Sequence, residues 1–162
     1  ELPRLGLSWK LDGALENVAW YGRGPHENYI DRCSSAFIGR YASTVTDQYV
    51  PYVRPQENGA KGDVRWVAFT TAQGHGIRFA CDRPLFFRAL HYDWEDLEHW
   101  RHHRFEPRTY NPKPPRREVC LDLDIEQRGL GGASCGPKTM PKYTFPAKEE
   151  RWTVSLEPMG IK

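Results

Sequence analysis

Polar side chains that can do acid–base or hydrogen-bonding chemistry gather in residues 20–32, which read WYGRGPHENYIDR. His26 and Glu27 are neighbours there, and an imidazole beside a carboxylate is a potential pair of general acid and base. Asn28 and Arg32 add an amide and a guanidinium, which can hydrogen-bond sugar hydroxyls. The same four side chains can instead satisfy one another and the nearby backbone, because buried polar clusters are mostly structural. Both interpretations stay open.

A second group of hydrogen-bonding side chains lies in residues 55–59, which read PQENG. Glu57 offers a carboxylate and Asn58 an amide, and sugar hydroxyls need such acceptors and donors. An asparagine followed by glycine is also a strong turn signal by itself. The sequence therefore leaves a sugar-binding and a turn-forming interpretation of this stretch equally open.

Residues 129–137, which read GLGGASCGP, are the third stretch that could carry chemistry. Its four glycines give the backbone unusual freedom and let a ligand approach closely. Ser134, Cys135 and Gly136 are therefore candidates for contacts at the rim of a binding site. Cys135 can also be a buried packing thiol, because the reactivity of a thiol depends on its exposure and neighbours.

Two further clusters are better explained without chemistry. Residues 93–98 hold four carboxylates, which could supply the pair of acids that glycosidases need. We interpret them as the solvated face of a short helix, because acidic runs are usually solvating. The histidines of residues 99–103 could bind a metal, but no further ligand has suitable spacing, and incidental clustering is favoured. These histidines are His99, His102 and His103. We therefore assign no catalytic residue and no metal site.

Composition and charge exclude several classes of partner. A net charge of +2 over 162 residues gives no strong attraction to nucleic acid or to a membrane surface. Basic and aromatic residues mix in residues 100–117, but acids are interleaved and no nucleic-acid motif is present. No apolar run is long enough to span a bilayer, and no signal-peptide pattern is visible, so we expect a cytoplasmic protein. The four widely spaced cysteines favour free thiols over zinc or disulfides.

The elements that must position these stretches are short strands. Residues 5–11 alternate apolar and polar side chains, and this period of two predicts one buried and one solvated face. Residues 119–125 repeat the pattern. Residues 64–71 and 77–80 flank a QGHG turn and predict a hairpin. The strand that enters residues 20–32 is expected to end at the glycines there.

Other elements follow from the same reasoning. Asp93 can cap one short helix. Pro51 reduces residues 49–53 to an edge strand or an extended loop. Strands are also expected at residues 36–41, 85–92 and 148–157, the last with Trp152, Val154 and Leu156 facing inward. We therefore predict an all-β, antiparallel β-sandwich with one short helix.

The three stretches described above, together with residues 49–53 and 63–66, resemble in the same order the signature of the last domain of the large β-galactosidases of glycoside hydrolase family two. The resemblance covers nearly the whole chain and corresponds to about the C-terminal half of that terminal domain. It implies that residues 1–162 form a single domain with a galactose-mutarotase-like sandwich, also called a supersandwich. It further implies that this piece completes an enzyme that hydrolyses terminal β-D-galactosides such as lactose.

The resemblance also assigns roles to parts of the enzyme. The catalytic acid and nucleophile belong to an earlier barrel domain, so the isolated chain is expected to be inactive. The partners are the rest of the β-galactosidase chain and a galactoside, within a parent that forms a homo-oligomer. No cofactor is expected in this chain, and Mg²⁺ and Na⁺ belong to other domains of the parent. Some family members have tryptophan where this chain has Cys135, and a thiol offers no flat platform for stacking on a sugar.

Two other functions are compatible with the residues. A β-sandwich with exposed tryptophan and tyrosine can act as an autonomous carbohydrate-binding module, whereas buried aromatics favour a structural role. A mutarotase-like activity would need a positioned acid and base, for which His26 and Glu27 are the nominated pair. A half-sandwich should also expose apolar surface, so we expect the isolated chain to self-associate or to carry an apolar patch.

Overall fold

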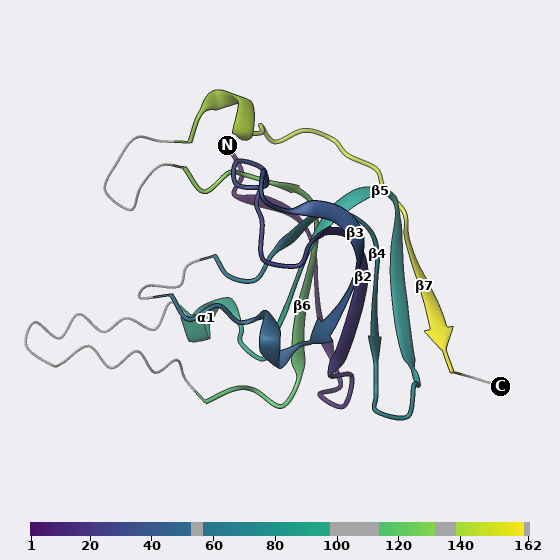
Figure 1. Cartoon of the computed structure of the whole chain (residues 1–162). Coiled ribbons are helices and arrows are strands. Elements are labelled where there is room, and N and C mark those ends of the chain that lie inside the picture. Colours follow the sequence, from purple (N-terminus) through teal and green to yellow (C-terminus); the bar gives the residue numbers. More distant parts are fainter. Residues whose placement is uncertain (53–56, 98–113, 132–138, 161–162) are drawn as a thin grey trace, which may run out of the picture.

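Seven antiparallel strands of one sheet form most of the fold in the computed structural model, which describes residues 1–52, 57–97, 114–131 and 139–160. The all-β, sandwich-like class predicted from the sequence is confirmed, and one short α-helix accompanies the strands (Figure 1). The strands are β1 (Arg4–Leu11), β2 (Asn17–Gly24), β3 (Phe37–Thr44), β4 (Lys61–Thr70), β5 (Gly76–Leu90), β6 (Val119–Gln127) and β7 (Val154–Met159). The helix is α1 (Trp94–Leu97), and the two 3₁₀ turns are η1 (Thr46–Gln48) and η2 (Pro141–Tyr143).

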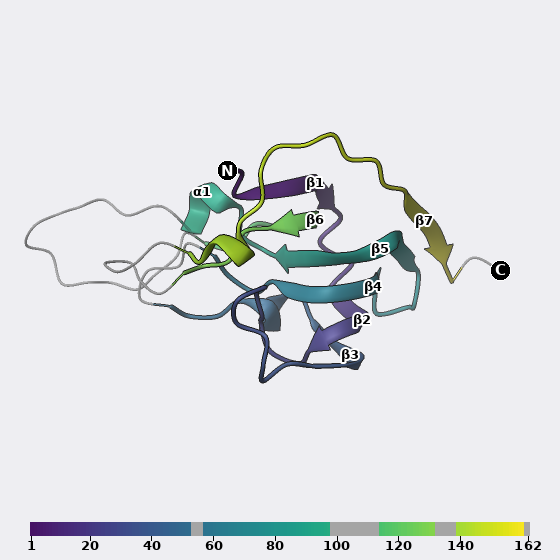
Figure 2. The same ribbon diagram turned by 90° about the horizontal axis from the view of Figure 1, so that it is seen from above.

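The strands follow one another across the sheet in the order β1-β6-β5-β4-β2-β3, as Figure 2 shows from above. The long strand β5 pairs with β7 through its first part and with β6 through its last part. The sequence predicts two separate strands here, at residues 77–80 and 85–92, and this is wrong. The register between β4 and β5 shifts on either side of Val64. Residues 81–84 of β5 fall within this irregularity, and the pairing with β4 continues past Pro84.

The hydrophobic core lies on one face of this sheet. Trp20 of β2 packs against Phe87 of β5, with ring centroids 5.7 Å apart, and both side chains are 1% exposed. Phe79 of β5 contacts the half-buried Trp9 of β1 at the same centroid distance. Burying side chains of this size stabilises the fold by roughly 1.5–3 kcal/mol each. Aromatic side chains of β2, β4 and β5 therefore supply much of the hydrophobic core.

The opposite face of β5 and β6 is also buried, but it carries charges. Arg88 lies 2.9 Å from Asp122, and Arg4 lies 3.0 Å from Asp124. Both guanidinium carbons are 3.9 Å from the ring centroid of Trp94 in α1, which is cation–π contact. The alternation in residues 119–125 predicts solvated carboxylates, and this is wrong, because α1 and Arg4 cover that face.

Asp93 lies directly before helix α1. Its carboxylate accepts from the Trp94 N–H at 2.7 Å, and the Asp96 carboxylate accepts from the Asp93 N–H at 2.8 Å. Asp93 therefore caps the helix as predicted, with its carboxylate on the first helical N–H. The predicted solvated face is wrong for Asp96, which is 5% exposed and accepts from Arg116 Nε at 2.5 Å. An arginine 20 positions later in the chain thus balances a buried charge that looked like part of an acidic surface run.

Other predicted elements can be compared with the structure in the same way. Strand β2 ends at Gly24, as expected, and a Cβ at Gly22 would lie 2.6 Å from a Val64 methyl, so close strand packing explains that glycine. Residues 49–52 form the extended loop and no strand. Val154 packs on the core, but Leu156 is 45% exposed and does not face inward.

The surface can be compared with the expected apolar patch. Phe37 and Ile38 at the start of the edge strand β3 are 72% and 45% exposed. They are the kind of edge feature that favours self-association, which stays a prediction for this chain. Among the residues that the structure describes, no helix has the length and apolar character needed to cross a membrane.

Candidate functional site

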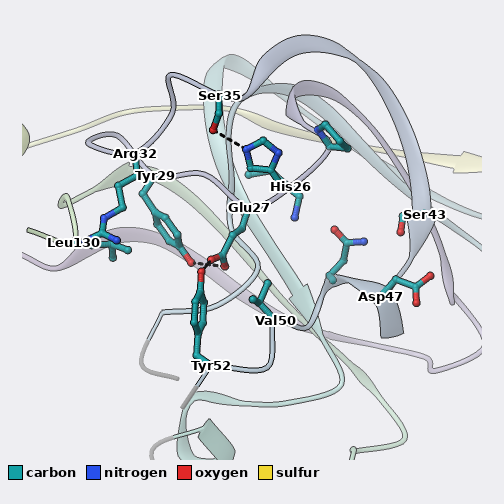
Figure 3. A pocket seen from close by; sticks show the side chains of 13 residues that line it. His26, Glu27, Tyr29, Arg32, Ser35, Ser43, Asp47, Val50, Tyr52 and Leu130 are labelled. Carbon is teal, nitrogen blue, oxygen red and sulfur yellow. Dashed lines mark hydrogen bonds between the residues drawn. The ribbon is translucent and has the colours of Figure 1, made fainter. Parts of the chain in front are cut away.

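A pocket of about 510 Å³ opens where the loop after β2 meets η1 and the first residue of β4. Figure 3 shows that loop, with His26, Glu27 and Arg32, facing Ser43 and Asp47 across the pocket. A volume of several hundred cubic ångströms is typical of a site for a small molecule. The structure therefore brings three of the predicted site residues to one cavity.

Glu27 is the most heavily bonded side chain of this pocket. Its carboxylate accepts from the Tyr29 hydroxyl at 3.1 Å, from the Gly59 N–H at 2.7 Å and from the Tyr52 hydroxyl. Figure 3 shows both tyrosine hydroxyls directed at the carboxylate. Burial and then the bond to Glu27 raise the pKa of Tyr52 to about 12, so this phenol remains a donor at neutral pH. Glu27 is thus held in one position by three donors.

His26 lies on the same loop but bonds elsewhere. Its Nε2 is 2.9 Å from the Ser35 hydroxyl, and the side chain is exposed. In the part of the chain that the structure describes, no hydrogen bond joins His26 to Glu27. The pair nominated for acid–base work therefore lines one pocket as two separate units.

The two predicted asparagines are almost completely buried and bond to the backbone. Asn28, 1% exposed, accepts from the Gly62 N–H at 2.9 Å and donates to the His26 carbonyl at 3.2 Å. Asn58, fully buried, accepts from the N–H of Val50 and donates to its carbonyl. Gly59 next to it has a φ of 74°, as the turn-forming interpretation of residues 55–59 requires. Both amides therefore hold the walls of the pocket.

Glu57 and Arg32 make ion-pair and loop contacts. The Glu57 carboxylate binds Arg4 Nη2 through both oxygens, at 2.6 and 2.7 Å, and so joins the charged face of the sheet. Arg32 donates from Nη2 to the carbonyl of Gly131 at 2.7 Å. Arg32 therefore connects the pocket loop with the glycine-rich stretch after β6.

Asp31 completes this connection, although no role for it was predicted from the sequence. Its two carboxylate oxygens accept from the N–H groups of Leu130 and Gly131, at 3.0 and 2.8 Å. Asp31 and Arg32 together thus satisfy both donors and one acceptor in residues 130–131. The candidates Ser134, Cys135 and Gly136 follow this anchored base and lie outside the described residues, as do His99, His102 and His103.

Lys61 lines the pocket, and the sequence did not reveal it as a site candidate. Its side chain is 2% exposed, and its ammonium donates to the Gly59 carbonyl at 3.0 Å. Burial lowers the pKa of Lys61 to about 8, although the charge of Glu27 opposes the change. A lysine at the end of a strand is expected to be exposed. Only the neighbouring glycines, Gly59 and Gly62, could have indicated that it is closely packed.

Tryptophans offer little platform for stacking on a sugar in the described part of the chain. Trp20 is 1% exposed, and Trp9, Trp66, Trp94 and Trp152 are half-buried. Tyr52, 46% exposed, is the aromatic side chain that reaches solvent at the pocket. Among the described residues, no group of three or more histidines, cysteines, aspartates or glutamates is close enough to hold a metal ion.

Comparison of the sequence with known proteins finds a matching family and several similar β-galactosidases. The family described as "Beta galactosidase small chain" matches residues 1–156. The chain is 35% identical over 161 residues to a β-galactosidase of Priestia megaterium, covering 98% of this chain and 15% of that protein. It is 36% identical over 133 residues to a β-galactosidase of Vibrio cholerae, covering 81% of this chain and 11% of that protein.

A third relative gives the same result. The β-galactosidase BgaC of Bifidobacterium adolescentis is 37% identical over 134 residues, which cover 81% of this chain and 12% of the relative. The chain therefore spans only about a seventh or less of the curated relatives that it matches. Because the family match extends over nearly the whole sequence, the chain belongs to the β-galactosidase small-chain family.

Proposed function

We propose that this chain is the terminal part of a β-galactosidase that hydrolyses terminal β-D-galactosides of the lactose type. The family match over residues 1–156 is the observation that carries the proposal. The chain corresponds to 11–15% of its relatives, so the rest of the enzyme is its main partner. In this proposal the catalytic carboxylates, and any Mg²⁺ or Na⁺, belong to that remaining part, and the parent is a cytoplasmic homo-oligomer.

The contribution of the chain itself would be to place residues 129–137 at the rim of the active site. Asp31 and Arg32 support this role, because their three hydrogen bonds fix the backbone of residues 130–131 against the pocket loop. A segment anchored at its base can present its following residues to a neighbouring domain in a defined direction. Cys135 in place of an aromatic platform would then favour a different choice of leaving group.

Complementation of the parent enzyme tests the proposal. The parent is produced complete and without residues 1–162, and hydrolysis of nitrophenyl β-D-galactoside is measured for each. We expect activity for the complete protein, little for the truncated protein, recovery when the separate chain is added, and none for the chain alone. Turnover by the chain alone, or full activity of a correctly folded truncated parent, would contradict the proposal.

A further inference from the structure

The pocket beside Glu27 has a balanced set of charges. Arg32 and Lys61 line it as cations, and Glu27 and Asp47 line it as anions. A lining with equal numbers of opposite formal charges gives no strong preference for a charged ligand. The pocket is therefore better suited to a neutral molecule than to a phosphate or a carboxylate.

The hydrogen-bonding groups of the pocket are both donors and acceptors. Lys61 has three N–H donors, and its hydrogen bond to the Gly59 carbonyl uses one of them. The Glu27 carboxylate has about four acceptor positions, of which Tyr29, Tyr52 and the Gly59 N–H occupy three. A ligand hydroxyl, which donates and accepts at once, can use the remaining capacity of both side chains.

Tyr52 adds an apolar surface at the mouth of the pocket. Its hydroxyl is fixed by Glu27, which restrains the ring, while 46% of the residue remains exposed (Figure 3). A restrained aromatic ring is a low-entropy surface for the C–H face of a ring-shaped polyol. A pocket of about 510 Å³ also has room for one such ring with its hydroxyls.

From these observations we infer that the pocket between the loop after β2, η1 and the start of β4 binds one neutral pyranose unit. Lys61 and Glu27 hydrogen-bond its hydroxyls, and Tyr52 contacts its apolar face. The inference does not depend on the proposed role in a β-galactosidase, because the described residues that line the cavity all belong to this chain.

Titration calorimetry of the complete chain with single sugars tests this inference. The probes are methyl β-D-galactopyranoside, methyl β-D-glucopyranoside and methyl α-D-mannopyranoside, each up to about 0.1 M, with inorganic phosphate as the charged comparison. We expect saturable binding of at least one pyranoside with a Kd in the millimolar range, about −4 kcal/mol, and much weaker binding of phosphate. No saturable heat with any pyranoside, or phosphate as the tighter ligand, would overturn the inference.

Variants then locate the binding. Tyr52→Ala should weaken it about tenfold, as expected for losing a ring contact and a fixed hydroxyl, and Tyr52→Phe should weaken it less. Lys61→Met should abolish most of it. Phe37→Ala, at a 72% exposed aromatic outside the pocket lining, is the matched control and should change nothing. If Lys61→Met does not fold, Glu27→Gln replaces it, and unchanged affinity in both Tyr52→Ala and the second variant would contradict the inference.

Discussion

The carboxylate of Asp31 accepts from the N–H of Gly131 at 2.8 Å, across 100 positions of the chain. Its other oxygen accepts from the N–H of Leu130, and the neighbouring Arg32 donates to the carbonyl of Gly131. Two consecutive residues of the pocket loop therefore hold one peptide segment through both its donors and an acceptor. This pairing joins two of the stretches that lie far apart in the sequence, and it fixes the position of residues 130–131.

Asp31→Asn should loosen this junction. One carboxylate oxygen becomes an NH₂ group that faces a backbone N–H, so one half-buried donor loses its acceptor at a cost of about 1 kcal/mol. We expect faster amide hydrogen exchange at Leu130 and Gly131 and a lower urea midpoint. Asp47→Asn is the control, because Asp47 is exposed and belongs to η1 rather than to the loop that bonds residues 130–131. Equal exchange at Leu130 in both variants would contradict the assigned role.

Asp31 shows what sequence reasoning can and cannot find in such a site. The composition of residues 20–32 correctly indicated a dense polar loop, and His26, Glu27 and Arg32 do line one pocket. The pattern could not say which polar groups bond to distant backbone, because that depends on strands β2 and β6 being brought into one sheet. Asp31 was missed for this reason, since its partners are backbone groups of the loop after β6. Lys61 bonds to the nearby Gly59 carbonyl, and it was missed because its burial depends on how the surrounding elements pack.

Gly129→Ala should be costly for a reason that Asp31 supplies. An added Cβ would lie 2.7 Å from the Asp31 carboxylate carbon, so that side chain would have to move away from Leu130 and Gly131. A loss of about 1–3 kcal/mol in the free energy of unfolding is expected from such overpacking. A double-mutant cycle with Asp31→Ala checks the cause. The cost of Gly129→Ala should largely disappear in the Asp31→Ala background, and full additivity would rule out this contact as its source.

Lys61 should make stability depend on pH in the alkaline range. Its pKa is about 8 in the fold and 10.5 in the unfolded chain, so between these values only the unfolded state keeps the proton. Stability therefore rises as pH increases from about 8 to about 10.5, by roughly 3 kcal/mol in total. Urea unfolding of the wild type and of Lys61→Met across this range measures the difference. The gap between the two proteins should change with pH in this direction, and a constant gap would show that burial does not depress this pKa.

The fold was predictable where a pattern depends on one strand and its turn. The alternation in residues 5–11 and the turn between residues 71 and 76 predicted β1 and the turn of the β4–β5 hairpin within a few positions. The pattern failed on β6, because alternation of apolar and charged residues reads as one dry and one wet face. Whether the charged face is solvated depends on residues that are distant in the sequence. Here Arg4 and Trp94 cover the face that carries Asp122 and Asp124.

Asp124, on that covered face, should make stability depend on pH in the acidic range. Burial raises the pKa of its carboxyl to about 6, and the charge of Asp122 adds to this, while Arg4 opposes it. The folded chain therefore keeps the proton between pH 4 and 6 where the unfolded chain, with a pKa of 3.8, has lost it. This group alone should lower stability by about 3 kcal/mol as pH rises through that range.

Asp124→Asn isolates this contribution, because the amide oxygen can still accept from Arg4 and no proton is involved. Other carboxylates, such as Asp93 with its lowered pKa, act in the opposite direction, so only the difference between the two proteins is informative. We expect the variant to be less stable than the wild type at pH 4 and to equal or exceed it at pH 7, measured by urea unfolding. If the variant instead loses more stability at pH 7 than at pH 4, the ion pair with Arg4 outweighs the cost of burying the Asp124 charge.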